Sequence, residues 1–270
     1  MSNISASSAD RGLAILELLV NEPSGLPMSI IAQRLKLPVS ATHRLLSVLV
    51  ARRYARQDPV SEAYHATMAV AALGVRLLAG SNFIEVCQPV LEEFASRTGE
   101  LVRLSVLEGD HLIWVAKAQG ARASIRYDPI SGRDVPLHVT AMGKAWLATL
   151  PEDDAVRLVL DRGFGGDLIG PKATRTVEGL REQLRLTKDR GFALVEEEAE
   201  VGISGIATVV RDALSPGRPV VGCVSVAGPT FRLDRERLVG FAQPLKDAAE
   251  RLSDLWPVRA YYAQQGREVA

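Results

Sequence analysis

Residues 27–56 read PMSIIAQRLKLPVSATHRLLSVLVARRYAR, which predicts two helices joined by a tight turn. The first is expected over 29–36, and Pro38 should end it because a proline pushes the preceding residue out of helical geometry. The second is expected from about Ser40 to Arg52, with an apolar and a polar face on opposite sides. The apolar face consists of Thr42, Leu45, Leu46 and Leu49, and the polar face of Ser40, His43, Arg44 and Ser47.

The polar face of the second helix has the composition that a DNA major groove accommodates, with short polar side chains and an arginine. From Pro23 to Gln57 the chain carries six Lys or Arg and no Asp or Glu, so this segment attracts phosphate although the net charge of the chain is zero. The segment therefore predicts a DNA-binding helix-turn-helix, and an ordinary solvated helix pair is the alternative. The expected DNA contacts are Arg34, Ser40, Ala41, Thr42, His43, Arg44, Ser47, Arg53 and Arg56.

The neighbouring segments complete a winged fold. A helix is expected over 9–20, and strand, polar turn and strand at 54–67 are typical of a hairpin wing. Residues 68–78 (MAVAALGVRLL) are so apolar that the helix they predict needs a partner, either the second domain or another subunit. The predicted organisation is a disordered lead at 1–8, a winged helix-turn-helix domain at 9–67, a linker helix at 68–80, a second domain at 81–257 and a tail at 258–270.

Residues 81–257 predict an α+β domain on a mostly antiparallel sheet, because hairpin turns separate neighbouring strands. Helices are expected over 83–97, 140–150, 152–162, 177–190 and 234–255. Strands are expected over 101–107, 111–118, 123–127, 192–196, 206–211 and 220–227.

The composition of the 270-residue chain is that of an ordinary globular protein. No apolar run approaches the roughly 20 residues that span a membrane, and the N-terminus lacks the features of a signal peptide. Cys87 and Cys223 have no metal-ligand spacing, and free thiols suit a reducing cytoplasm, where we expect the protein to act. The sequence contains no nucleophile elbow, phosphate-binding loop or HExxH motif, and the three glutamates at 196–198 alternate between the faces of a strand. We therefore expect no enzyme activity, catalytic residue, cofactor or metal site.

The start of the predicted helix 140–150 is a candidate ligand site. With Thr140 as its N-cap, the backbone N–H groups of Ala141, Met142 and Gly143 would point out of the helix and bind a carboxylate. The alternative is that Thr140 only caps the helix and Gly143 packs against a strand. His138 alone is more typical of a core or loop histidine than of a catalyst.

Taken together, several motifs resemble the IclR (isocitrate lyase regulator) family of bacterial transcription regulators, over a stretch from about Ala9 to Leu255. The motifs are Ser40–Leu46, Tyr64–Gly74, Phe83–Glu85, Pro136–Lys144, Arg190–Phe192, Glu197–Ala207 and Gly228–Pro229. Each motif is weak alone, but their order and spacing are specific.

The resemblance implies a winged helix joined by a linker helix to a GAF-like effector-binding domain. It implies a dimer or a dimer of dimers on a palindromic operator, controlling a catabolic operon in response to a small organic acid. The acid would bind at the start of helix 140–150 and to side chains of the last strands. The alternatives are a small-molecule enzyme and a protein-interaction module that uses the winged helix only for assembly. The missing catalytic motifs count against the first, and the basic run at 23–57 counts against the second.

The sequence departs from the family pattern in the expected pocket. Gly205 stands where the family often has cysteine, a polar pair on the last strand is reduced to Ser225 with Ala227, and Val195 stands at an acidic position. These departures predict a roomier, less polar pocket and an effector larger than glyoxylate or pyruvate, such as an aromatic or alicyclic acid. The expected effector contacts are Trp114, Ile125, His138, Thr140, Ala141, Met142, Gly143, Val195, Gly205, Ser225 and Ala227.

Overall fold

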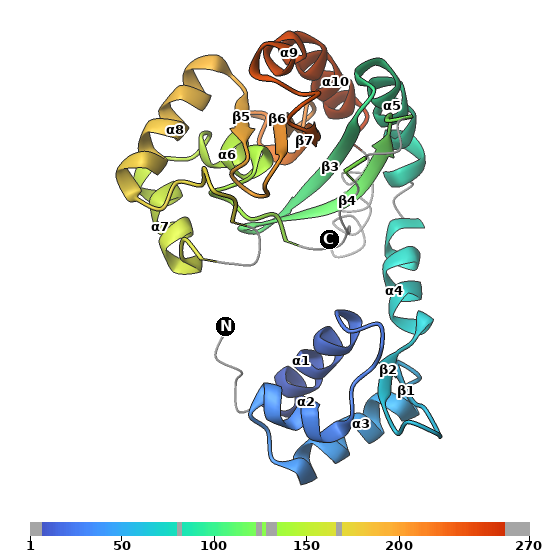
Figure 1. Cartoon of the computed structure of the whole chain (residues 1–270). Helices are drawn as coiled ribbons and strands as arrows, with labels where there is room; N and C mark the ends of the chain where they lie inside the picture. The colour runs from blue at the N-terminus through green and yellow to red at the C-terminus, as the bar shows by residue number, and fades with distance from the viewer. Residues whose placement is uncertain (1–6, 80–82, 123–125, 128–133, 166–168, 257–270) are drawn as a thin grey trace. The chain divides into compact units, whose positions relative to one another are not determined.

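The computed structural model of the chain describes residues 7–79, 83–122, 126–127, 134–165 and 169–256 (Figure 1). The chain divides into two compact units, Met1–Ser81 and Asn82–Ala270. Each unit contains a hydrophobic core of its own. The predicted lead and tail fall mostly on residues 1–6 and 257–270, which lie outside the described residues.

Unit 1 is a winged helix-turn-helix, as the sequence predicts. Its elements are α1 (Ser8–Val20), α2 (Met28–Leu35), α3 (Val39–Ala51), β1 (Ala55–Gln57), β2 (Tyr64–Ala66) and α4 (Met68–Ala79). Strands β1 and β2 pair antiparallel, and Leu26 forms an isolated bridge to Tyr64 that ties the α1–α2 loop to the hairpin. Ile15, Ile31 and Leu46 are fully buried where α1, α2 and α3 meet.

The end of α2 is set by Lys36, whose backbone adopts the left-handed conformation, rather than by Pro38. Lys36, at the C-terminus of α2, has a φ of 53°. The N–H of Leu37 then donates to the carbonyl of Ala32 at 2.9 Å, which closes the helix end. Pro38 caps the start of α3, and its carbonyl accepts the N–H of Thr42 at 2.9 Å.

Among the described residues, unit 2 is built on a five-stranded antiparallel sheet with the strand order β4-β3-β7-β6-β5. The strands are β3 (Leu101–Glu108), β4 (His111–Gln119), β5 (Ala193–Glu196), β6 (Ile203–Arg211) and β7 (Val220–Pro229). The helices are α5 (Phe83–Thr98), α6 (Ala141–Leu147), α7 (Glu152–Arg162), α8 (Val177–Arg190), α9 (Arg235–Gly240) and α10 (Ala242–Asp254). Helices α5 and α10 pack on one face of the sheet, and α6, α7 and α8 cover the other (Figure 1). The α+β prediction is confirmed.

Three predicted elements of unit 2 differ in the structure. The closing helix is divided into α9 and α10 at Phe241, because the ring of Pro244 would clash with the carbonyl of Gly240 in a continuous helix. The helix predicted over 140–150 ends at Leu147. The strand predicted over 123–127 falls on 123–125, which lie outside the described residues, and on two residues that belong to no strand.

None of the helices in the described part of the chain combines the length and the apolar character needed to cross a membrane. Within the same residues, no three His, Cys, Asp or Glu side chains come together in a group that can hold a metal ion.

Candidate functional site

The polar face of α3 is presented to solvent as the periodicity predicts. Leu46 and Leu49 point the other way, into the core of unit 1. Short polar side chains and one guanidinium thus form a continuous exposed stripe on a helix that its buried side holds rigidly. The residues of this stripe are Ser40, His43, Arg44 and Ser47.

Thr42 is the exception among the predicted DNA contacts. Its side chain is fully buried, and its hydroxyl donates to the carbonyl of Pro38 at 3.1 Å. Thr42 thus belongs to the buried apolar face of α3 and not to the exposed stripe, and its contact with DNA stays a prediction that its burial disfavours. Ala41 is half-buried beside it.

The predicted arginine contacts differ in their local charge balance. Arg34 forms an ion pair with Glu22, which lies directly before the acid-free run. Glu22 lies outside residues 23–57, so counting charges in that segment alone overstates the positive charge near Arg34. Arg53, which follows the C-cap residue Arg52 of α3, is exposed and has a φ of 64°.

Arg56 lies on the hairpin that forms the wing. Its guanidinium is 3.9 Å from the carboxylate of Asp58 at the hairpin turn. That carboxylate also accepts the N–H groups of Val60 and Ser61, at 3.0 and 2.8 Å, and these hydrogen bonds lower the pKa of Asp58. The wing is thus held in shape by its own turn, with Arg56 exposed at its base.

A pocket in unit 2 collects most of the residues that the sequence predicts for an effector. It lies between α6 and the sheet and has a volume of about 60 Å³. Trp114, Thr140, Ala141, Met142, Val195, Gly205, Ser225 and Ala227 all line it, together with Arg103, Tyr127, Ala199, Ile203, Ser204 and Val226. Of the other predicted contacts, His138 and Gly143 do not line it, and Ile125 is outside the described residues.

The strand register explains why residues distant in sequence meet in this pocket. Gly205 on β6 lies opposite Val195 on β5 and opposite Ala227 on β7. Two residues along β7 from Ala227, and therefore on the same face, Ser225 lies opposite Arg103 on β3. Opposed residues share a face of the sheet, so these side chains form the floor of the pocket.

Arg103 is the principal pocket residue that sequence reasoning missed. Its side chain is 3% exposed, and its guanidinium carbon lies 3.8 Å from the ring centre of Trp114. A β-bulge where β3 residues 104 and 105 meet β4 turns Trp114 toward this face. An arginine inside the otherwise apolar run LVRLSVL was the available signal. Arg103 thus places a charge in the lining of a pocket that the sequence predicts to be less polar.

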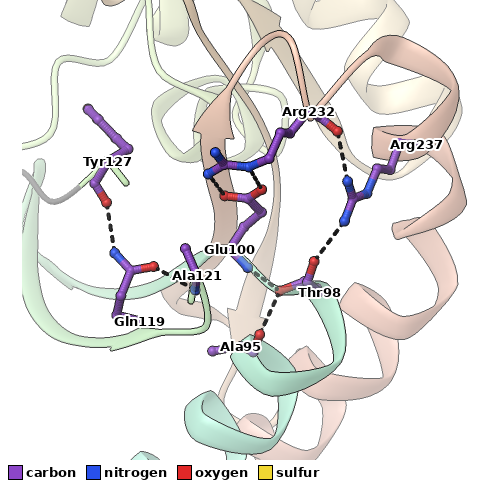
Figure 2. Close-up of polar contacts among 8 residues, drawn as sticks. All are labelled: Ala95, Thr98, Glu100, Gln119, Ala121, Tyr127, Arg232 and Arg237. Atoms are coloured by element: carbon purple, nitrogen blue, oxygen red, sulfur yellow. Dashed lines mark hydrogen bonds and ion pairs between the residues drawn. The ribbon is translucent and has the colours of Figure 1, made fainter. Parts of the chain in front are cut away.

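Tyr127 is another lining residue that was not predicted from the sequence. Its hydroxyl is hydrogen-bonded to the carboxylate of Glu200, and burial raises its pKa to about 12. Gln119, at the end of β4, holds the backbone in place, donating to the carbonyl of Tyr127 and accepting the N–H of Ala121, each at 3.0 Å (Figure 2). The position of Tyr127 is therefore set by a side chain of the sheet.

An ion pair with one buried partner joins elements at the end of the sheet beside this anchor. Arg232, after β7, donates to both carboxylate oxygens of Glu100, at 2.7 and 3.0 Å, and Glu100 is 2% exposed (Figure 2). Arg237 on α9 adds hydrogen bonds to the carbonyls of Arg232 and Thr98. The carbonyl of Glu100 accepts the N–H of Gly120, next to Gln119. These contacts join α5, β3, β4 and α9 into one rigid support.

The start of α6 is a capped helix end. The Thr140 hydroxyl donates to the carbonyl of Pro136 at 2.6 Å and accepts the N–H of Gly143 at 3.1 Å. The Gly143 N–H therefore has a partner within the protein and is not available to a ligand. The cap and the close packing of Gly143 agree with the structural alternative, whereas Thr140, Ala141 and Met142 line the pocket, so contact of the helix start with an effector stays a prediction.

Replacing Gly143 by alanine is expected to destabilise unit 2 by about 1–3 kcal/mol, the cost of overpacking a core. An added Cβ would lie 2.3 Å from the carbonyl oxygen of Leu137, whereas at Gly240, at the end of α9, it would meet open space. Urea unfolding of both variants measures the difference. Equal stability of Gly143→Ala and the control Gly240→Ala would contradict the packing role.

Behind α6 lies a buried charged cluster outside the pocket. Lys144, 1% exposed, forms an ion pair with Glu198, and burial raises the pKa of Glu198. His138 lies nearby, 5% exposed, with its ring edge-to-face against Phe164 at 5.2 Å. Burial, and secondly the charge of Lys144, lower the pKa of His138. His138 is thus a core histidine that does not line the pocket, and its contact with the effector stays a prediction that this position disfavours.

A winged helix-turn-helix with an exposed polar recognition face, followed by an α+β unit with a charged pocket, defines the class of DNA-binding regulators with a separate regulatory domain. The chain belongs to the IclR family of bacterial transcriptional regulators. The profile of the IclR helix-turn-helix domain matches residues 8–59, and that of the bacterial transcriptional regulator IclR C-terminal domain matches residues 75–254.

Similar proteins agree with this assignment. The HTH-type transcriptional repressor AllR of Escherichia coli K12 is 27% identical over 256 residues, covering 95% of this chain and 92% of the repressor. An IclR regulator from Alicyclobacillus acidocaldarius has a TM-score of 0.78 at 22% identity, covering 93% and 99% of the two chains. An IclR homologue from Microbacterium hydrocarbonoxydans, solved with 4-hydroxybenzoate, has a TM-score of 0.71 at 21% identity, covering 92% and 98%. The two family profiles identify the chain as a transcriptional regulator.

Proposed function

We propose that this chain is a repressor of a catabolic operon, which binds a palindromic operator through α3 and is controlled by a small organic acid. The observation that carries the proposal is the exposed polar stripe of α3, rigidly backed by the core, in a chain of the IclR family. Its Escherichia coli relative AllR is a transcriptional repressor, which supports repression. A regulator of this kind acts on DNA in the cytoplasm.

The number of contacts that one recognition helix can make supports assembly into a dimer or a dimer of dimers. Each good bidentate base contact contributes about 1–3 kcal/mol, and α3 carries one exposed arginine on its polar stripe. A two-fold symmetric protein doubles these contacts on a palindrome. Helix α4 supplies apolar surface for a partner, since Val75 and Leu77 are 63% and 60% exposed.

The chemistry of the pocket supports an acid as the effector. A buried guanidinium, the hydroxyl-bearing side chain of Ser225 and apolar walls are combined in one small site. The volume of about 60 Å³ is well below the roughly 300–1,000 Å³ of drug-sized ligand pockets. It favours a short acid over the aromatic acid suggested by the sequence departures. An aromatic acid, such as the 4-hydroxybenzoate bound by the Microbacterium protein, requires pocket residues to move.

DNA recognition is tested by selection from a random duplex library with the purified chain, followed by fluorescence anisotropy on the selected sequence. We expect a palindromic consensus and an affinity that falls steeply between about 50 and 200 mM salt. A selection that yields no consensus, or equal affinity for a scrambled duplex, would contradict the proposed function.

A further inference from the structure

We propose that Glu22 limits the affinity of the protein for DNA by competing with backbone phosphate for Arg34. The proposal rests on the proposed function, in which unit 1 binds DNA, and it names a residue that sets the strength of the sequence-independent contacts. The acid concerned lies just before the segment that the sequence predicts to bind DNA.

Glu22 and Arg34 form an ion pair in which, among the described residues, neither side chain has a second charged partner. Oε1 of Glu22 accepts a hydrogen bond from Nη1 of Arg34. Glu22 lies in the loop after α1 and Arg34 lies on α2, so the pair joins the loop to the second helix. The side chain of Glu22 is 31% exposed and that of Arg34 is 47% exposed, so a phosphate can reach the guanidinium.

Asp58, the acid beside Arg56 on the wing, has a structural role that Glu22 lacks. The carboxylate of Asp58 accepts two backbone N–H groups of its own turn, and these hold the hairpin in shape. The carboxylate of Glu22 accepts no backbone N–H from the described residues, and exposed ion pairs contribute little to stability. The main consequence of Glu22 is therefore the partial neutralisation of Arg34.

The helix that carries Arg34 is the one that crosses the DNA backbone in helix-turn-helix complexes. The recognition helix enters the major groove, and the first helix of the pair lies across the phosphates. In this chain α2 is that first helix, and Arg34 is an exposed cation in its last turn. Phosphate must then replace Glu22 at the guanidinium, which leaves the displaced carboxylate beside the like-charged DNA. Exchanging one anionic partner for another adds less affinity than binding an unpaired arginine.

The test is a double-mutant cycle of Glu22→Gln and Arg34→Gln in the full chain. Fluorescence anisotropy measures binding to the selected operator and to a scrambled duplex over a series of salt concentrations. Glu22→Gln should tighten binding to both duplexes by the same factor, roughly two- to fivefold for each subunit in contact, because every sequence presents phosphate. The slope of log affinity against log salt should steepen by up to about 0.9 for each Arg34 that contacts phosphate.

The cycle separates competition for Arg34 from the simple loss of a negative charge. If Glu22 competes with phosphate, Glu22→Gln tightens binding more in the wild-type background than in the Arg34→Gln background. Arg34→Gln accordingly weakens binding more when Glu22 has already been replaced. An equal or larger gain from Glu22→Gln in the Arg34→Gln background would overturn the inference and leave DNA recognition by α3 standing.

Glu17→Gln is the matched control for the charge. Glu17 is an exposed glutamate of α1 that forms no ion pair in the part of the chain that the structure describes. Its replacement should change DNA affinity by less than about twofold, because a charge that only adds to the overall field is screened by salt. Circular dichroism verifies that every variant is folded.

A gain from Glu17→Gln as large as that from Glu22→Gln would also overturn the inference, since net charge alone would then explain the effect. Wild type that binds neither duplex would overturn the inference together with the proposed function.

Discussion

Arg44→Ala is expected to abolish sequence-specific operator binding while leaving folding and assembly intact. Arg44 is exposed on the polar stripe of α3 and has no role in the core of unit 1. Loss of one bidentate base contact in each of two subunits amounts to about 2–6 kcal/mol, or roughly a 30-fold to 10⁴-fold loss of affinity. Anisotropy with the selected operator measures this loss, and scrambled DNA should be bound almost as well as by wild type.

The matched control for this prediction is Arg157→Ala. Arg157 is an exposed arginine on helix α7 of unit 2, paired with Asp154 at 2.8 Å, so its removal changes net charge equally without touching α3. If Arg44→Ala and Arg157→Ala bind the operator equally well, α3 does not read bases through Arg44.

Lys144→Met is expected to destabilise unit 2 by about 3–5 kcal/mol, the cost of leaving a buried charge without its partner. Lys144 and Glu198 are both buried, with side chains 1% and 8% exposed. Lys172→Met is the matched control, because Lys172 pairs with the adjacent Glu197 at 3.1 Å but is 57% exposed, and it should change stability by less than about 1 kcal/mol. Urea unfolding followed by circular dichroism measures both variants.

The defect of Lys144→Met should depend on pH and on Glu198. Burial raises the pKa of Glu198, and the charge of Lys144 opposes that shift, so removing Lys144 raises the pKa further. The folded variant then binds a proton more readily than the unfolded chain, and its stability relative to wild type should improve as the pH falls. Adding Glu198→Gln should recover most of the loss at neutral pH. A double variant as unstable as Lys144→Met would show that packing, rather than charge, causes the defect.

Local periodicity carried most of the information that the sequence holds about this fold. The two faces of α3 follow from the spacing of Thr42, Leu46 and Leu49, all of which are buried. The same spacing places Thr42 on the apolar face of the helix. The prediction that Thr42 contacts DNA therefore disagrees with the periodicity of its own helix. The break between α9 and α10 was also readable, because Pro244 cannot lie in the interior of a continuous helix.

The pocket was predictable in its residues but not in its chemistry. The family resemblance named positions on α6 and on the last strands, and the register of β5, β6 and β7 brings them together. Arg103 and Tyr127 enter through long-range geometry, namely the β-bulge that turns Trp114 and the anchor that Gln119 provides. The positions of Arg103 and Tyr127 depend on contacts between residues that are far apart in the sequence, and a short stretch of sequence does not reveal these contacts. For the same reason the sequence could not show that Arg103 and Tyr127 would take up space in the pocket.

The measurement that tests the central claim most directly is the affinity of the protein for its acid with and without operator DNA. If acid binding in unit 2 controls DNA binding by unit 1, the two ligands must change one another's affinity by the same factor. Titration of pyruvate or glyoxylate, whichever binds, into free protein and into the operator complex should give dissociation constants that differ by about 5- to 150-fold, matching the shift in operator affinity caused by saturating acid. Identical acid affinities in the two titrations would contradict the account, because an acid that does not distinguish the two states cannot regulate DNA binding.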